Sequence, residues 1–214
     1  MIAVLDYGIG NLRSAEKALQ HLGVDAALTT DPAVAREAAG VVLPGVGAFG
    51  RCMEQLRESG LEPVVHEAVE AGTPFLGICV GMQMLFDASE EAPGCAGLGI
   101  IPGEVRRLVT TERLPHMGWN TLKIRSGSVL FDGLPDGSWL YFVHSYAPVP
   151  DDDGVVAATT DYGGEVVAAV EQGSVWATQF HPEKSAANGL QLLTNFARAC
   201  AAPFAGAAPA TRAA

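Results

Sequence analysis

Cys79 lies in a segment whose residue types suit a reactive thiol. Between Pro74 and Phe86, an apolar run rich in strand formers is followed by a cysteine flanked by glycines and then by an apolar, helix-like run. Gly77 and Gly81 let the backbone turn sharply from strand to helix, so that the side chain at the apex points outward as in a nucleophile elbow. A helix N-terminus beneath the sulfur favours the thiolate, the reactive form of cysteine. The segment therefore predicts a cysteine nucleophile.

A second segment supplies a base and an acid much later in the chain, at His181 and Glu183. Residues two apart in an extended segment point to the same side, and Pro182 would hold that conformation. One imidazole nitrogen then donates to the carboxylate while the other faces the thiol. Each signal alone has an ordinary explanation, a buried cysteine in a tight turn or a surface His–Glu pair. Together they predict a triad of nucleophile, base and orienting acid.

A glycine-rich loop at 44–50 follows a short buried strand. Glycines permit unusual backbone angles and close approach, so the backbone of Gly45, Val46 and Gly47 could direct an N–H at a developing oxyanion. The alternatives are a phosphate-binding loop, although the Lys-Ser/Thr ending of a P-loop is absent, or a plain tight turn. A second glycine-containing stretch at 8–13 lacks the third glycine of a dinucleotide fingerprint.

Two polar side chains lie within reach of the same turn. Gln83 comes four residues after Cys79 and should project from the same helix face. Its neutral amide suits a polar, uncharged substrate group, and the alternative is an amide that caps a loop. Glu91 follows this helix and could hold an ammonium group, but on spacing alone a solvated loop position is equally consistent.

Composition limits the classes of function. The chain has 214 residues, of which 49% are hydrophobic and 17% charged, enough for a substantial core. No apolar run approaches the roughly 20 residues of a membrane span, and the N-terminus lacks the basic region of a secretory signal. The net charge of −11 argues against a nucleic-acid surface. The four cysteines form no zinc-ligand cluster. We therefore expect a soluble, cytoplasmic protein with no metal, no cofactor, no membrane contact and no disulfide framework.

The elements that must position these residues follow an alternating pattern. Strands are expected at 2–6, 25–30, 41–43 and 75–78, and helices at 11–22 (capped by Asn11), from Asp31-Pro32, and at 50–58, 61–71 and 80–87. Further strands are expected at 104–109, 121–125, 139–146, 155–160, 166–171 and 174–180, with a hairpin turn at Gln172-Gly173 and a closing helix at 187–201. The pattern predicts an α/β fold with a mostly parallel central sheet flanked by helices and an antiparallel β extension. One domain should span 1–201, and the Ala/Pro-rich residues 202–214 should be a disordered tail.

The elbow at 77–83 and the segment 180–183 together resemble the class I, triad-type glutamine amidotransferases. The segments 6–11, 44–50, 115–120 and 141–146 are similar to one family within this class, the glutaminase subunits of imidazole glycerol phosphate synthase. The similarity extends over the chain up to the alanine-rich tail, and every triad position fits. The resemblance implies hydrolysis of glutamine to glutamate and ammonia by Cys79, His181 and Glu183.

The resemblance also implies a partner and further site residues. Ammonia would pass to a cyclase subunit, a (β/α)₈ barrel, which forms imidazole glycerol phosphate and aminoimidazole carboxamide ribotide in histidine biosynthesis. The oxyanion would be stabilised by backbone N–H groups near Val80 and within Gly45–Gly47. The same comparison assigns Gln83, Glu91, Ser145 and Tyr146 to substrate binding, and Asn11, Met117, Trp119, Tyr141 and Lys184 to the partner interface.

Three other interpretations stay open on the sequence. The chain could serve another synthase, of the pyridoxal phosphate, anthranilate or guanine nucleotide type, although 6–11 and 115–120 argue against it. It could be an inactive binding module, which the intact triad opposes. It could be a cysteine peptidase on a related fold, which Gln83 and the spacing of His181 and Glu183 disfavour.

Overall fold

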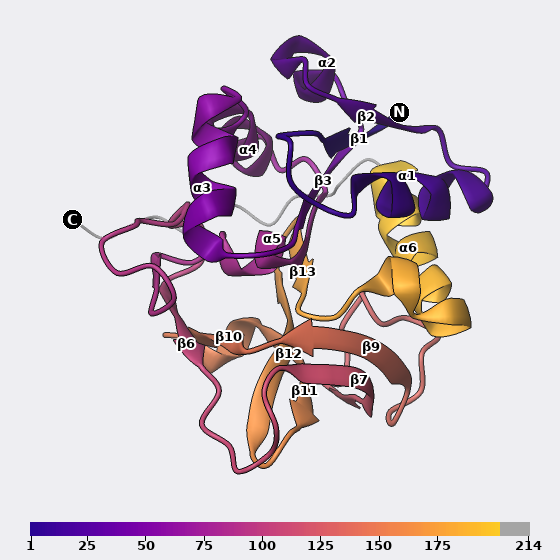
Figure 1. Ribbon diagram of the computed structural model, residues 1–214. Coiled ribbons are helices and arrows are strands. Elements are labelled where there is room, and N and C mark those ends of the chain that lie inside the picture. The colour runs from indigo at the N-terminus through magenta and orange to yellow at the C-terminus, as the bar shows by residue number, and fades with distance from the viewer. Residues whose placement is uncertain (202–214) are drawn as a thin grey trace.

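An eight-stranded sheet forms the centre of the computed structural model, which describes residues 1–201 (Figure 1). In sheet order its strands are β2 (Ala26–Thr29), β1 (Ile2–Leu5), β3 (Gly40–Gly45), β4 (Phe75–Cys79), β13 (Val175–Thr178), β12 (Glu165–Gln172), β11 (Val156–Asp161) and β8 (Lys123–Ile124). Neighbours are parallel from β2 to β13 and antiparallel from β13 to β8. This confirms the predicted fold class. The tail expected at 202–214 lies outside the described residues.

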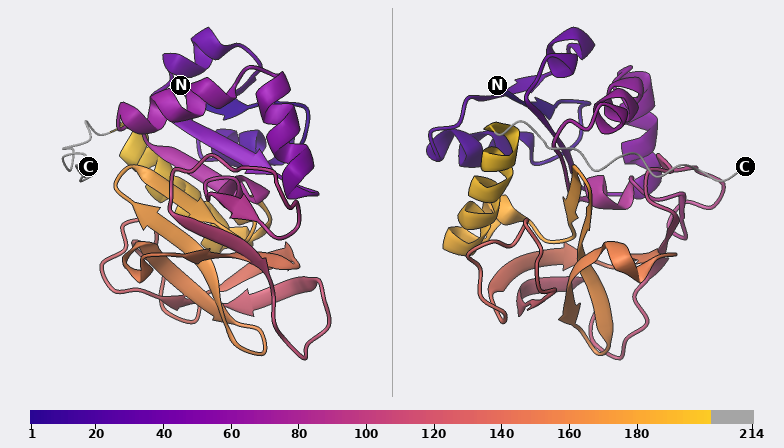
Figure 2. Two further views of the ribbon diagram at one scale, coloured as in Figure 1. Left: turned by 90° about the vertical axis from the view of Figure 1, so that its left-hand side faces the viewer. Right: turned by 180° about the vertical axis from the view of Figure 1, so that it is seen from behind.

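Helices cover both faces of the parallel part of the sheet. They are α1 (Leu12–His21), α2 (Pro32–Arg36), α3 (Phe49–Glu58), α4 (Glu62–Glu70), α5 (Val80–Gln83) and α6 (Ala186–Ala201). In Figures 1 and 2, α1 and α6 lie on one side of the sheet and α3 and α4 on the other. The central strands β1, β3 and β4 are buried along their whole length, as expected for a parallel sheet covered on both faces.

Two helix starts were predicted from their capping residues, with different outcomes. The Asp31 side chain accepts a hydrogen bond from the backbone N–H of Ala33, and Pro32 occupies the first turn of α2, as expected. Asn11 precedes α1 but makes no such bond to the backbone. Its Oδ1 instead accepts a hydrogen bond from the Ser14 hydroxyl, at 2.9 Å. The predicted cap is therefore wrong, because the Asn11 side chain binds another side chain and not a backbone N–H of the helix.

The antiparallel part of the chain departs most from prediction. Two small sheets lie beside β11 and β12 of the main sheet, in the lower half of Figure 1: β10 (Tyr146–Pro150), β6 (Gly103–Arg107) and β5 (Ala88–Ser89), and β7 (His116–Thr121) with β9 (Trp139–His144). The strand β7 was missed, and the strand expected at 139–146 is two strands that separate at Ser145. The helix expected at 80–87 ends at Gln83, and the last hairpin turns at Gly173 and Ser174. These segments take their shape from pairing with distant strands, which local pattern does not encode.

Glycines allow the backbone to pack closely around the β4–α5 turn. A Cβ built on Gly81 would lie 1.9 Å from the Leu43 carbonyl oxygen, and one on Gly77 would lie 2.9 Å from the Gly81 carbonyl oxygen. On the neighbouring strand, a Cβ on Gly45 would lie 2.6 Å from the Gly81 nitrogen. Only residues without a side chain fit at these three positions. The glycines thus bring β3, β4 and α5 into direct backbone contact.

The β7–β9 sheet encloses a buried pair of histidines. His116 Nδ1 lies 3.0 Å from His144 Nε2, and the two side chains are 3% and 6% exposed. The His116 ring stacks on Tyr162 at a centroid distance of 3.9 Å and on Phe142 at 4.8 Å. Burial lowers the pKa of both His116 and His144 to about 4, so both rings are neutral at pH 7.

Among residues 1–201, no helix is long and apolar enough to cross a membrane.

We predict that Gly81→Ala lowers the free energy of unfolding by about 3 kcal/mol or more, because its Cβ would overlap the Leu43 carbonyl. Urea unfolding measures the effect. The control is Gly23→Ala, where nothing lies within 4 Å of the added Cβ; the backbone there is left-handed at φ +76°, which by itself should cost about 1 kcal/mol. Equal losses in the two variants would contradict the role assigned to the close backbone contact.

We predict that stability falls as the pH is lowered from about 6.5 towards 4. The folded-state pKa of both His116 and His144 lies below the ordinary value of 6.5, so the unfolded chain binds more protons in this window. At pH 5 the loss should be roughly 1–2 kcal/mol for each histidine. Urea unfolding at pH 7 and pH 5 tests this. His144→Asn should reduce the loss, whereas the same change at the exposed His21 should leave it unaltered.

Candidate active site

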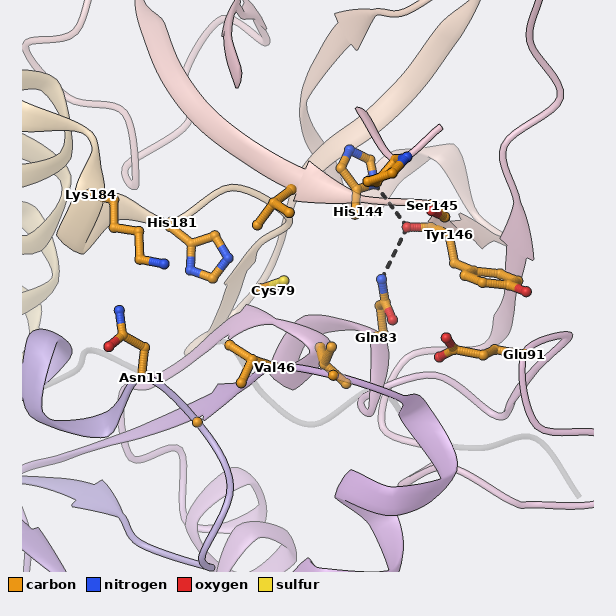
Figure 3. A pocket seen from close by; sticks show the side chains of 15 residues that line it. Asn11, Val46, Cys79, Gln83, Glu91, His144, Ser145, Tyr146, His181 and Lys184 are labelled. Carbon is orange, nitrogen blue, oxygen red and sulfur yellow. Dashed lines mark hydrogen bonds between the residues drawn. The ribbon is translucent and has the colours of Figure 1, made fainter. Parts of the chain in front are cut away.

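A cavity of about 600 Å³ opens at the carboxyl ends of β3 and β4, the edge where ligands bind in open parallel sheets (Figure 3). Segments from distant parts of the chain meet there. Its lining comprises Gly10, Asn11, Val46, Gly47, Cys79, Val80, Gln83, Glu91, Pro115, Val143, His144, Ser145, Tyr146, His181 and Lys184. The cavity therefore brings together most of the residues that the sequence singled out for chemistry.

Cys79 occupies the turn between β4 and α5 in a strained conformation. Its φ of 57° and ψ of −111° lie outside the regions that residues with side chains ordinarily adopt. Such a conformation costs about 1–3 kcal/mol and persists only where the surroundings enforce it. The side chain is 4% exposed, and its sulfur accepts a hydrogen bond from Gln179 Nε2 at 3.7 Å. The predicted sharp turn at Cys79 is thus present.

His181 and Glu183 form a buried pair on the opposite wall of the cavity. His181 Nδ1 lies 2.8 Å from Glu183 Oε1, and the two side chains are 1% and 2% exposed. The expected extended segment is wrong: Pro182–Lys184 form a 3₁₀ turn, because proline suits the first position of a helical turn. This turn still brings the Glu183 carboxylate into hydrogen-bond contact with the His181 ring.

The second nitrogen of His181 remains available for chemistry. Nε2 is buried and has no hydrogen-bond partner among the described residues. In Figure 3 one ring nitrogen of His181 points toward Cys79 across the floor of the cavity. Burial alone lowers the pKa of His181, but its polar interactions with Cys79 and Glu183 outweigh that effect and raise the pKa to about 9. The ring is therefore protonated at pH 7 and can donate a proton from Nε2.

The glycine-rich loop lies over the same cavity. Val46 and Gly47 line it together with Val80, whereas Gly45 ends β3 in register with Cys79 and does not line it. Two buried groups hold the carbonyls of the loop: the Tyr7 hydroxyl donates to Pro44 O at 2.6 Å, and Cys52 Sγ donates to Val46 O at 3.3 Å. The main chain of the loop is thus held at two carbonyl groups, those of Pro44 and Val46.

The residues expected to bind substrate line one side of the cavity. Gln83 Nε2 donates to Tyr146 O and to Gln179 Oε1, each at 3.0 Å, so its amide is ordered within the wall. Glu91 Oε2 accepts from the Phe49 backbone N–H at 2.7 Å, which ties the carboxylate to the first turn of α3. Ser145 and Tyr146 complete this side.

The residues expected at a partner interface occupy two places. Asn11 and Lys184 line the cavity and lie beside His181 in Figure 3, on the side of its ring away from Cys79. Met117 and Trp119 project from the outer face of β7, where they are 62% and 49% exposed. Tyr141 contacts Trp119 edge-on, with ring centroids 6.2 Å apart.

Sequence reasoning gave no role to Gln179 and His144, although both lie at the site. Gln179 contacts the Cys79 sulfur, and His144 lines the cavity while its Nδ1 lies 2.9 Å from Tyr146 O. A signal existed for each, since both are polar residues in otherwise apolar strand-like runs. A buried polar residue in such a run requires a partner, which the sequence does not name.

Residues 1–201 contain neither a cluster of potential metal ligands nor a disulfide bond. No group of three or more His, Cys, Asp or Glu side chains in this range could hold a metal ion. Cys52, Cys79, Cys95 and Cys200 are all free thiols.

Comparison with known proteins agrees with the geometry. The family model "Glutamine amidotransferase class-I" matches residues 3–200. The relatives include proteins named imidazole glycerol phosphate synthase subunit HisH. The one from Bacillus cereus (strain G9842) is 49% identical over 92% of this chain and 93% of its own. Those from Syntrophotalea carbinolica and Aquifex aeolicus are 51% and 50% identical, over 92% and 91% of this chain and 98% and 95% of their own.

Among solved structures, a crystal structure of a glutamine amidotransferase superposes with a TM-score of 0.73 at 26% identity, covering 94% of this chain and 99% of its own. The residues matched by the family model, 3–200, include the turn at Cys79 and the His181–Glu183 pair. This chain is therefore a member of the class-I glutamine amidotransferase family.

Proposed function

We propose that this chain is the glutaminase subunit of an imidazole glycerol phosphate synthase and that Cys79, His181 and Glu183 carry its chemistry. The observation that carries the proposal is the convergence of a strained cysteine and a carboxylate-bound histidine on one cavity. Relatives about half identical over most of this chain, all named as the HisH subunit of that synthase, support the choice among amidotransferases. They disfavour the alternatives of another synthase and of a cysteine peptidase.

In the first half of the reaction, Cys79 Sγ attacks the side-chain carbonyl carbon of glutamine. A tetrahedral intermediate forms, and its oxyanion is stabilised by backbone N–H groups of Val80 and of the loop at Val46 and Gly47. His181 donates its Nε2 proton to the departing nitrogen, so that ammonia leaves and a thioester remains on Cys79. Its raised pKa of about 9 suits this donation at neutral pH.

In the second half, water attacks the thioester with His181 as the general base. The carbon–sulfur bond breaks, glutamate leaves, and the imidazole returns to its protonated form beside Cys79. Glu183 keeps the proton on Nδ1 throughout through its 2.8 Å contact, so that Nε2 always faces the reacting atoms.

Substrate and partner contacts complete the proposal. Gln83 and Glu91 contact the polar groups of glutamine, with Ser145 and Tyr146 on the same wall. The exposed face of β7, together with Asn11, Tyr141 and Lys184, meets a cyclase subunit with a (β/α)₈ barrel, which receives the ammonia. The exposed apolar side chains Met117 and Trp119 suit such a contact. We place the complex in the cytoplasm, where the four free thiols fit a reducing compartment.

The complex with the cyclase subunit and its nucleotide ligand should release ammonia from glutamine, and Cys79→Ala should abolish this release. Ammonia is measured by a coupled dehydrogenase assay, with and without the cyclase. The control is Cys95→Ala, which removes a free thiol outside the cavity and should retain wild-type activity. Full glutaminase activity in Cys79→Ala would refute the assignment of Cys79 as the nucleophile. An inactive wild-type complex would refute the proposed function.

Glu183→Gln should lower kcat for glutamine hydrolysis by roughly 100-fold with little change in KM, because the carboxylate orients the base without touching the substrate. The measurement is steady-state kinetics of the complex. Glu165→Gln, which alters an exposed glutamate on β12, serves as the matched control and should behave as wild type. An unchanged kcat in Glu183→Gln would exclude the orienting role.

A further inference from the structure

A continuous series of hydrogen bonds leads from the catalytic sulfur to β7. Gln179 Nε2 donates to Cys79 Sγ, and Gln179 Oε1 accepts from Gln83 Nε2. Gln83 Nε2 also donates to Tyr146 O, which is shared with His144 Nδ1 (Figure 3). We call the two histidines beyond this point, His144 and His116, the histidine pair.

The direction of these bonds is fixed at the cavity end. Tyr146 O is a backbone carbonyl and can only accept, so His144 must carry its proton on Nδ1. Because the ring is neutral, its Nε2 is then an acceptor. It therefore takes a proton donated by His116 Nδ1, at 3.0 Å.

The direction is fixed independently at the far end. Asn120 Oδ1 accepts from the Thr121 backbone N–H at 2.8 Å, and Asn120 Nδ2 donates to the Asp161 carbonyl at 2.8 Å. The remaining Nδ2 hydrogen is thus offered to His116 Nε2, at 3.2 Å, which must accept. This requires the proton of His116 to lie on Nδ1. Both ends impose the same tautomer on each histidine.

The consequence for the cavity is that the Tyr146 carbonyl is held by two donors, Gln83 Nε2 and His144 Nδ1. Both lone pairs of the carbonyl are occupied, so the main chain at Ser145 and Tyr146 is fixed where it lines the cavity. Both hydrogens of the Gln83 amide are also used, which leaves its Oε1 as the acceptor available to a ligand. The wall thus offers a fixed pattern of polar groups.

We propose that the histidine pair positions the substrate-binding wall: His144, held in its Nδ1–H tautomer by His116, fixes the Tyr146 carbonyl and with it the Ser145–Tyr146 main chain. This inference rests on the proposed glutaminase function and concerns residues to which that function gave no role. The histidine pair touches neither the substrate carbonyl nor Cys79, and it exchanges no proton in the reaction. Its effect is on glutamine binding, not on the chemical step.

Steady-state glutaminase kinetics of the complex with cyclase and its nucleotide ligand test the proposal. His144→Phe keeps the ring shape but removes the donor, and should raise KM for glutamine about fivefold to tenfold while kcat changes less than about threefold. His144→Asn places an amide N–H near the position of Nδ1 and should restore KM to within about threefold of wild type. His66→Phe, on α4 and outside the cavity, is the control for loss of a histidine.

The outcomes separate this proposal from the function on which it rests. An inactive wild-type complex refutes the glutaminase function itself. An active wild type with unchanged KM in His144→Phe, or equal defects in His144→Phe and His144→Asn, overturns the positioning role and leaves the function standing. Co-elution of each variant with the cyclase in size-exclusion chromatography, together with its urea unfolding curve, confirms that every variant still folds and assembles.

A spectroscopic measurement tests the tautomer directly. The ¹⁵N shifts of the His144 ring, in protein labelled at histidine, should show a protonated Nδ1 and an unprotonated Nε2 at pH 7. His116→Phe removes the donor to His144 Nε2 and should shift the proton of His144 partly to that nitrogen, with a matching rise in KM. A wild-type His144 protonated on Nε2 would overturn the proposal.

Discussion

The left-handed backbone of Cys79 is the constraint on which the site depends. A non-glycine residue adopts φ of 57° and ψ of −111° only where its neighbours leave no alternative. Here the neighbours are backbone atoms of β3 and α5, brought close because Gly45, Gly77 and Gly81 have no side chains. The turn directs the sulfur into the cavity, which His181 of the proposed triad also lines.

Around the sulfur, polar side chains are buried within an otherwise apolar interior and almost all of them are paired. Gln83 and Gln179 are 3% and 0% exposed, and their hydrogen bonds to each other, to Cys79 and to Tyr146 use both hydrogens of Gln83 Nε2 and the amide oxygen of Gln179. Within residues 1–201, the buried side-chain atoms without a partner are His181 Nε2 and Glu183 Oε2. An unpaired buried polar atom is costly, and both lie at the proposed triad. The hydrogen bonds of the two glutamines fix the wall, while the unpaired nitrogen stays available for the proposed reaction.

The proposed triad and the proposed substrate-binding wall come from different parts of the fold. The triad residues lie in the parallel half of the sheet and the 3₁₀ turn after β13, whereas the wall lies at the junction of β9 and β10. The two parts are joined by the contacts of Gln83 and Gln179. On the proposed function, changes in the antiparallel part would alter glutamine binding without displacing Cys79.

Much of the fold, and the three residues of the proposed triad, could be predicted from local sequence. The alternation of strand and helix patterns up to Cys79 predicted the parallel sheet, because buried parallel strands and their covering helices each carry a distinct local pattern. The second half was predicted less well: β7 was missed, and 139–146 was taken as one strand. Such strands are half exposed, and their bounds depend on partners far away in the chain.

The sequence by itself determined the chemistry that Cys79, His181 and Glu183 can perform and the turn that presents the thiol, because residue type and glycine placement act locally. Only the tertiary structure decided that Gln179 bonds to the sulfur and that His116 sets the tautomer of His144. It likewise showed a 3₁₀ turn where an extended segment was expected. Hydrogen-bond partners distant in sequence are chosen by packing of whole strands, and no local pattern specifies which buried polar groups will meet.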